Sequence, residues 1–244
     1  MKLLLDDRYA PITSRIGFFE ADHERTVQEF LAWYTPLAEG WGDTLARREI
    51  AGPLPHALEA LLPLTIPDIK RFLFVPTADK WTAHFNSSRL GSDVVGPLDV
   101  VGFRLGCRTL RISAIPDSLG TKTDRMKGSR GRYGSSIFDL GAAGSYNQNQ
   151  SVRSICAMND GGRWSFDTYG TPLPFEEPEA YKARRKPDRF PFELLDKYCR
   201  ALGIRPFDED FYLPPEHPTA TLIERVGPRD PRDKEFPLAE VQAE

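Results

Sequence analysis

Basic residues gathered in two short segments are the feature of this 244-residue chain best suited to binding a charged partner. The first segment holds five lysines and arginines against a single acidic residue, Asp124, and an aromatic residue follows it directly. Guanidinium and ammonium groups at this density bind phosphates or acidic protein surfaces. The sequence therefore predicts a partner contact through Lys122, Arg125, Lys127, Arg130, Arg132 and Tyr133.

A second basic segment follows in a proline-interrupted stretch, and three glutamates just upstream offer local neutralisation as the alternative to a partner. Each segment carries a local charge of +4. The whole chain has 32 basic and 35 acidic residues, so the remainder carries −11. Basic segments set against an acidic remainder favour a protein partner over nucleic acid. Nucleic-acid grooves also usually stack bases on several aromatic side chains, and the first segment has only one tyrosine. The second segment comprises Lys182, Arg184, Arg185, Lys186 and Arg189, after Glu176, Glu177 and Glu179.

The common catalytic and metal-binding motifs are missing from the sequence. None of the four histidines belongs to an HxH or HxxxH pair, and no CxxC pair is present, so the spacing of a zinc site is absent. There is no Gly-x-Ser-x-Gly elbow and no Gly-Lys-Ser/Thr phosphate loop. The spacing of Gly128, Gly131 and Gly134 matches no nucleotide fingerprint. We therefore expect no catalytic constellation, no metal and no cofactor.

Three carboxylates remain as candidates for acid–base chemistry, namely Asp139, Asp167 and Glu224, each in a predicted strand. A catalytic pair must meet in space, which a single sequence does not reveal. The alternative is that they occupy outward positions on strands, with Arg111 or Arg163 as a cross-strand ion-pair partner.

Helix-like and strand-like periods alternate along the chain. Helices are predicted over 23–37, from Pro53, over 94–105 with Ser92 or Asp93 as the cap, and over 190–202. Because most strands follow one another through tight turns, we expect an α+β fold with a mostly antiparallel mixed sheet flanked by helices. The predicted strands cover residues 71–75, 81–85, 108–114, 135–140, 152–158, 163–169 and 219–226, and in the second of these one face is expected to be wetter.

Hydrophobic residues make up 40% of the chain, which is enough for a sizeable core and excludes a disordered protein or a small disulfide scaffold. No flexible Gly/Ser linker divides the sequence, so we predict a single compact domain over 1–226. Mixed charges and three prolines predict an extended or disordered tail over 227–244. The polar stretch 117–131 is predicted to be a long, poorly ordered loop.

The start Met1-Lys2-Leu3-Leu4-Leu5 predicts a short strand, because Asp6 interrupts its apolar residues too early for a signal peptide. No uncharged apolar run reaches the roughly 20 residues that a membrane span needs. Cys107, Cys156 and Cys199 lie far apart in apolar patterns and are predicted to be buried, reduced thiols. These features together predict a cytoplasmic protein.

Two stretches, about residues 70–113 and 163–212, resemble uncharacterised bacterial immunity proteins of polymorphic or secreted toxin systems. The shared order is a strand, a Trp strand, a Gly-x-Asp turn, a helix and a strand, and later a second Trp strand followed by four short motifs. The residues that carry it are Phe72-Leu73-Phe74-Val75-Pro76, Lys80-Trp81-Thr82-Ala83-His84-Phe85-Asn86-Ser87, Gly91-Ser92-Asp93, Gly106-Cys107-Arg108-Thr109-Leu110-Arg111, Trp164-Ser165-Phe166, Gly170, Leu173-Pro174-Phe175-Glu176, Tyr181, Arg189-Phe190 and Leu202-Gly203-Ile204.

The resemblance implies a non-enzymatic protein that binds and neutralises one cognate bacterial toxin by direct protein–protein contact. Its contact surface would include the 122–132 loop, the 144–150 segment or the acidic remainder. A different class of function is an enzyme acting on a phosphorylated or nucleotide substrate, with Arg125, Arg130 and Arg132 as anion binders and Asp139 as a base. A structural or phage-associated protein is the third hypothesis.

Overall fold

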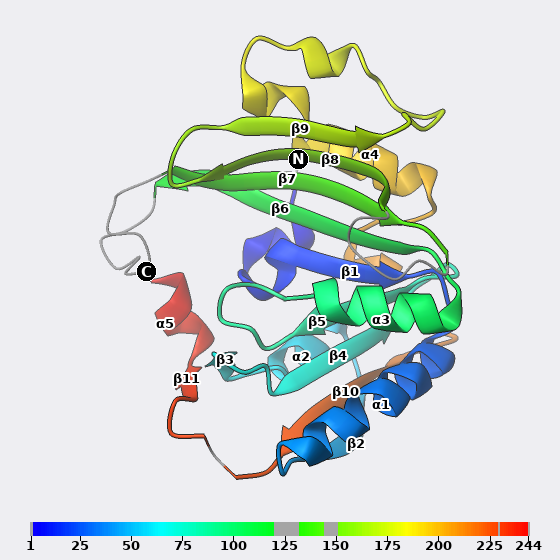
Figure 1. The fold of residues 1–244 in the computed structure, drawn as a ribbon, viewed down its shortest axis with the longest axis vertical. Helices are drawn as coiled ribbons and strands as arrows, with labels where there is room; N and C mark the ends of the chain where they lie inside the picture. The colour runs from blue at the N-terminus through cyan, green and yellow to red at the C-terminus, as the bar shows by residue number, and fades with distance from the viewer. Residues whose placement is uncertain (1, 120–131, 144–150, 229, 244) are drawn as a thin grey trace.

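A large antiparallel sheet forms the centre of the molecule (Figure 1). The computed structural model describes residues 2–119, 132–143, 151–228 and 230–243. Its strands are β1 (Arg15–Phe19), β2 (Thr44–Ala51), β3 (Leu64–Ile66), β4 (Arg71–Pro76), β5 (Thr82–Asn86), β6 (Thr109–Leu119), β7 (Arg132–Gly141), β8 (Ser151–Asp160), β9 (Ser165–Gly170), β10 (Thr219–Val226) and β11 (Lys234–Phe236). Nine of them pair in the order β2-β10-β4-β5-β1-β6-β7-β8-β9, and β11 pairs separately with β3. The predicted α+β fold with a mostly antiparallel sheet is therefore confirmed.

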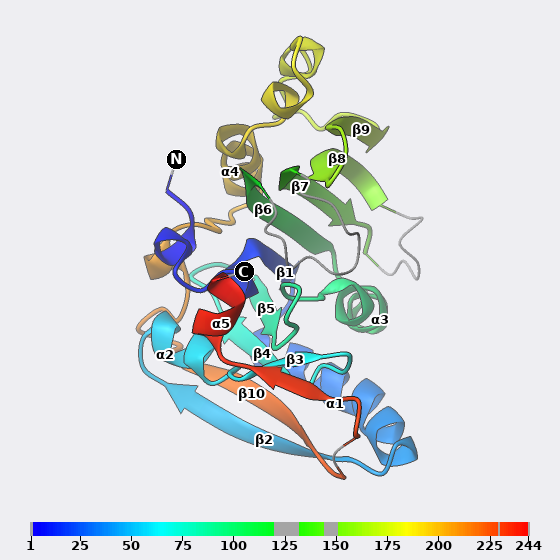
Figure 2. The same ribbon diagram turned by 90° about the vertical axis from the view of Figure 1, so that its left-hand side faces the viewer.

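Helices cover both faces of the sheet (Figure 2). The helices α1 (His23–Gly40) and α3 (Val95–Leu105) lie on one face, while α2 (Leu54–Glu59) and α4 (Phe192–Ala201) lie on the other. Each face has its own cluster of buried apolar side chains. This layered arrangement buries the central strands on both sides, as expected for a sheet between two helical layers.

The helix ends follow local chemistry in most places. The Asp22 carboxylate accepts a hydrogen bond from the Arg25 backbone N–H at 3.0 Å, as predicted for the cap of α1. Gly106 ends α3 with a φ of 62°, a left-handed conformation that glycine adopts without a Cβ clash. The prediction that Ser92 or Asp93 caps α3 is wrong, because Val94 is the cap and makes no side-chain bond. The Ser92 hydroxyl instead donates to the Ile12 carbonyl at 3.0 Å.

The hairpin of β4 and β5 forms as predicted, but β5 has no wetter face. Both Thr82 and His84 are buried, because the α1–α3 layer covers the side of the sheet that an isolated hairpin would leave open. Two strands of the nine-stranded sheet are missing from the sequence prediction, and so are β3 and β11 of the small sheet. The five-residue β1 lies between β5 and β6, and the charged, exposed β2 forms one edge of the sheet.

Both ends of the chain differ from the sequence prediction. Leu4–Asp7 is a 3-10 helix instead of part of a strand. In the segment 227–244, predicted to be extended or disordered, the structure has β11 and the helix α5 (Leu238–Gln242). The side-chain amide of Gln242 donates to the backbone carbonyls of Arg8 and Ala10 at 2.8 and 3.0 Å. The partners of this segment lie in distant parts of the sequence, so its composition alone gave no sign of them.

A buried ion pair attaches the segment between β9 and α4 to the sheet. Arg153 in β8 donates two hydrogen bonds of 2.8 Å to the Glu176 carboxylate, and the two side chains are 3% and 0% exposed. The Tyr181 hydroxyl and the Leu173 backbone N–H donate to the same carboxylate at 2.8 and 2.9 Å. Burial alone raises the pKa of Glu176, but these hydrogen bonds outweigh it and lower the pKa. The Leu-Pro-Phe-Glu motif is therefore a structural anchor.

No helix in the described part of the chain is both long and apolar enough to cross a membrane.

Candidate functional site

An open cavity of about 660 Å³ lies where four parts of the chain meet. Its walls come from the end of α1, the start of α3, the loop between β3 and β4, and the segment that follows β10. One wall is aromatic and the other is charged, and we call this cavity the aromatic–acidic cleft. A cavity of this size falls in the range of roughly 300–1,000 Å³ that is usual for ligand sites.

The aromatic wall belongs to the last turns of α1. Trp33, Tyr34 and Trp41 line the cleft, and Leu37 lies between the two tryptophans in sequence. Residues four apart share one side of a helix, so positions 33 and 37, and then 41 at its end, follow one stripe. Leu37 and Trp41 are 39% and 56% exposed, and large apolar side chains with this exposure are candidates for contact with another molecule.

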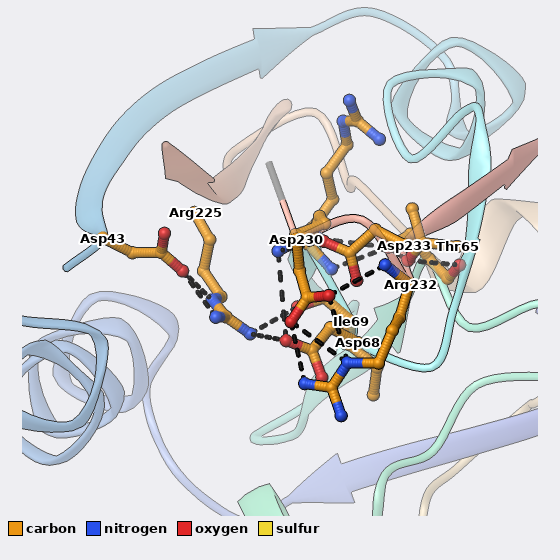
Figure 3. Close-up of polar contacts among 11 residues, drawn as sticks. Asp43, Thr65, Asp68, Ile69, Arg225, Asp230, Arg232 and Asp233 are labelled. Atoms are coloured by element: carbon orange, nitrogen blue, oxygen red, sulfur yellow. Dashed lines mark hydrogen bonds and ion pairs between the residues drawn. The ribbon is translucent and has the colours of Figure 1, made fainter. Parts of the chain in front are cut away.

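Arg225 of β10 is the centre of the charged wall (Figure 3). Its guanidinium donates to Asp43 from Nε at 2.8 Å, and its other end contacts Asp68 at 3.4 Å. The same guanidinium lies over the Trp41 ring, 4.7 Å from the ring centroid, a cation–π distance. A Cβ at position 227 would lie 1.9 Å from an Asp43 carboxylate oxygen, so this approach requires glycine.

The other two cations among the described lining residues are also paired with carboxylates. Lys70 forms an ion pair with Asp233 at 2.9 Å and lies 3.9 Å from Asp68. Arg232 contacts Asp230 at 2.8 Å, and these hydrogen bonds lower the pKa of Asp230 to about 2. Figure 3 shows Asp230, Arg232 and Asp233 gathered beside Arg225.

Asp93 differs from the other carboxylates of the cleft. It lies just before α3, is exposed, and has no hydrogen bond or ion pair from its carboxylate to any described residue. Its carboxylate attracts the Arg15 guanidinium only through a Coulomb interaction, without a hydrogen bond. An acid with no close partner at the mouth of a cavity is available to an incoming cation.

Most of the predicted partner-binding residues lie outside the described part of the chain. Lys122, Arg125, Lys127 and Arg130 belong to residues 120–131, and so does most of the predicted loop 117–131. Arg132 begins β7. Tyr133 is partly buried in the same strand and pairs with Asp160 of β8. The contact predicted for this segment stays a prediction.

The three candidate carboxylates do not form a catalytic pair. Asp139 in β7 lies opposite Arg111 in β6 and accepts a hydrogen bond from it at 2.8 Å, which is the predicted cross-strand ion pair. Asp167 is exposed on β9. Glu224 is in β10, on the other side of the sheet centre, and accepts a hydrogen bond from Arg71 at 2.8 Å. Each carboxylate therefore belongs to a separate environment.

The second basic segment is partly neutralised from within. Lys182 pairs with Glu179 at 2.7 Å, and Arg185 lies 3.6 Å from Asp188. Arg189 donates to the Ala183 carbonyl at 2.8 Å. The other two glutamates of the stretch pair with basic residues outside it. This favours the alternative of local neutralisation for part of the segment.

The histidines and cysteines do not assemble a metal site within the described residues, where no group of three or more His, Cys, Asp or Glu side chains is placed to hold an ion. The three cysteines are free, with Cys199 buried and the other two partly buried. Burial raises the pKa of Cys107 to about 11, so its reactive thiolate form is scarce at neutral pH.

The sequence prediction missed the aromatic–acidic cleft. One signal was readable, because the apolar residues at 33, 37 and 41 recur every four positions on a predicted helix and its end. The charged wall gave no local signal, since Asp43 and Arg225 are 182 residues apart.

Comparisons with known proteins give no match to a family model, to a curated protein or to a solved structure.

Proposed function

We propose that this protein binds and neutralises a partner protein by direct contact, as an immunity protein does for its cognate bacterial toxin. The aromatic–acidic cleft is the centre of the proposed contact. The observation that carries the proposal is the exposure of Trp41, which is 56% exposed and lines a cavity with a charged wall.

Protein interfaces draw most of their binding energy from a few side chains, and tryptophan is enriched among them. An exposed indole keeps apolar surface in contact with water, and burying that surface against a partner is favourable. Trp41 is therefore a suitable anchor. The ion pairs beside it form the polar surroundings that such anchors usually have. The cleft therefore has the composition expected of an interface centre.

The charges of the cleft are arranged for recognition rather than for proton transfer. A general acid or base works best with a pKa near the working pH, and active sites shift carboxylates toward that value. Asp230 is shifted in the opposite direction, to about 2, by its hydrogen bonds from Arg232. A carboxylate held ionised in this way attracts or orients a partner but holds no proton to donate at neutral pH.

The residues that carry the resemblance to immunity proteins have mainly structural roles. Trp81 is buried and donates its indole N–H to the Leu202 carbonyl at 3.1 Å, and Glu176 anchors the segment after β9. Trp41 and Arg225 lie outside both resembling stretches. Asp93 is an exception, because it belongs to a resembling stretch and also lines the cleft.

The test is to purify the tagged protein from its native host and identify what accompanies it. We expect a stoichiometric protein partner, and we expect Trp41→Ala to weaken binding of the isolated partner at least tenfold by calorimetry. Tyr169→Ala is the matched control. Tyr169 is 60% exposed and lies on β9, the edge strand at the other end of the sheet from β2, which follows Trp41 in the chain. Equal binding by wild type and Trp41→Ala would remove the cleft from the interface. A bound nucleotide without any protein partner would favour the enzyme hypothesis.

A further inference from the structure

We propose that the aromatic–acidic cleft receives a cationic side chain, an arginine presented by a basic segment of the partner protein. This inference rests on the proposed function and names the chemistry of the partner at the cleft. The juxtaposition that carries it is an exposed indole, a carboxylate with no close partner, and three cations that are already paired.

The cations that could attract an anionic ligand are already paired with carboxylates. Arg225 is bound by Asp43, Lys70 by Asp233 and Arg232 by Asp230. These are the described cations that line the cavity, and each has a carboxylate within 3 Å. A phosphate or carboxylate would have to displace one of these partners, which costs the existing ion pair.

Two carboxylates of the cleft are available to accept a cation. The Asp93 carboxylate has no ion pair among the described residues, and Asp68 is 47% exposed with only long contacts to Arg225 and Lys70. A carboxylate accepts a guanidinium through two parallel hydrogen bonds, which gives arginine an advantage over lysine. The cleft therefore offers carboxylate oxygens to an incoming guanidinium without first breaking a close ion pair.

The aromatic wall suits the same ligand. The Arg225 guanidinium lies over the Trp41 ring, 4.7 Å from its centroid, and the side chain is still 56% exposed, so the indole keeps open surface for a second cation–π contact. Trp33 adds a second indole to the lining. A planar guanidinium stacks on such rings, whereas the ammonium of lysine contacts them only as a point charge.

The wider electrostatic surroundings point in the same direction. A smaller cavity of about 210 Å³ adjoins the cleft and shares Lys70 and Arg225 with it. Together the two cavities are lined by seven acidic and four basic side chains in the described part of the chain. A surplus of acid over base raises the local concentration of cationic groups and accelerates their association.

A short peptide tests the chemistry without the partner. Acetylated and amidated tetra-arginine is titrated into the full chain at low ionic strength and followed by tryptophan fluorescence, with tetra-lysine and tetra-glutamate as comparisons. We expect tetra-arginine to bind most tightly, tetra-lysine several-fold more weakly, and tetra-glutamate not at all. Equal binding of the acidic and basic peptides would overturn the proposal.

Two variants place the peptide in the cleft. A Cβ at position 96, near the start of α3, meets no atom within 4 Å, so Gly96→Phe fills the cavity without a clash at its root. We expect Gly96→Phe and Asp93→Asn each to weaken tetra-arginine at least tenfold. The matched controls are Gly162→Phe, where a Cβ also meets nothing, and Asp167→Asn on exposed β9, which removes the same charge. Equal losses in the controls would show non-specific attraction and overturn the proposal.

The outcome separates this inference from the proposed function. If the protein partner is lost in Trp41→Ala while tetra-arginine does not bind, the cleft is an interface but its occupant is not a basic side chain. If Gly96→Phe weakens both the peptide and the protein partner, both proposals are supported. If neither ligand responds to Trp41→Ala or Gly96→Phe, both are wrong.

Discussion

Replacing Glu176 with glutamine is expected to lower the free energy of unfolding by about 3–5 kcal/mol, because the change leaves the Arg153 guanidinium buried without its counter-charge. The two side chains are 3% and 0% exposed, so water does not replace the lost carboxylate. The Tyr181 hydroxyl would also lose an ionised acceptor. Urea denaturation followed by circular dichroism measures the difference.

The control for this prediction is an ion pair in the same segment. Lys182 and Glu179 are 72% and 84% exposed, and Glu179→Gln should change the stability by no more than about 0.5 kcal/mol. Should Glu176→Gln fail to fold, the double variant Arg153→Met with Glu176→Leu decides the matter. It removes both charges together, so it should recover most of the loss. A double variant as unstable as the single one would show that packing and the lost hydrogen bonds of the Leu173 N–H and the Tyr181 hydroxyl, and not the unpaired charge, dominate.

The second large effect concerns His84, whose titration should make the protein less stable as the pH falls from about 6.5 to about 4. The ring is fully buried beside four phenylalanines, and burial lowers its pKa from 6.5 to about 4. The Leu73 carbonyl can only accept, so Nδ1 carries the proton of the neutral ring at 3.1 Å. Nε2 is then buried with no hydrogen-bond partner. The surrounding rings are Phe19, Phe30, Phe72 and Phe74.

The direction of the pH effect on stability depends on which state of the protein, folded or unfolded, binds the proton at His84. Below pH 6.5 the unfolded chain protonates at His84 while the folded protein stays neutral, so the free energy of unfolding decreases until the folded state also protonates near pH 4. A difference of about 2.5 pKa units corresponds to roughly 3 kcal/mol. At pH 7 and above this loss is absent.

The variant His84→Phe isolates this contribution. Its free energy of unfolding should change less between pH 7 and pH 4.5 than that of the wild type, because the variant lacks the titrating ring of His84. The carboxylates and His23 titrate in both proteins, so their contributions cancel in the comparison. The stability difference between the two proteins should therefore shift steadily in favour of the variant as the pH falls. A difference that stays constant over this range would show that His84 has an ordinary pKa in the folded protein.

Much of the fold was predictable because its signals are local. The helix α1 was recognisable from apolar residues at helical spacing and from the Asp22 cap, and the end of α3 from Gly106. The α+β class followed from tight turns between strands. The wetter face predicted for β5 is wrong because it depends on which helices cover the sheet, a property of the assembled layers and not of the hairpin.

The candidate site was less predictable. The sequence pattern predicted a contact through the basic residues of 122–132, which lie mainly outside the described part of the chain. It also offered three candidate carboxylates, and the structure places these on separate strands. It passed over Trp41 because one tryptophan after a helix has many ordinary roles. Only its exposure and its contact with Arg225 distinguish it.

The amino-acid sequence by itself determined the helices α1 to α4, most of the strands, the fold class and the two clusters of basic charge. These depend on periodicity, capping and composition over a few neighbouring residues. The tertiary structure alone decided the cleft, the β3–β11 pair and the buried ion pair of Arg153 and Glu176. Each of these joins groups from separate elements, as with Asp43 and Arg225 at 182 residues apart. Whether such groups meet depends on how the sheet orders its strands, because a side chain's type does not specify its distant neighbours.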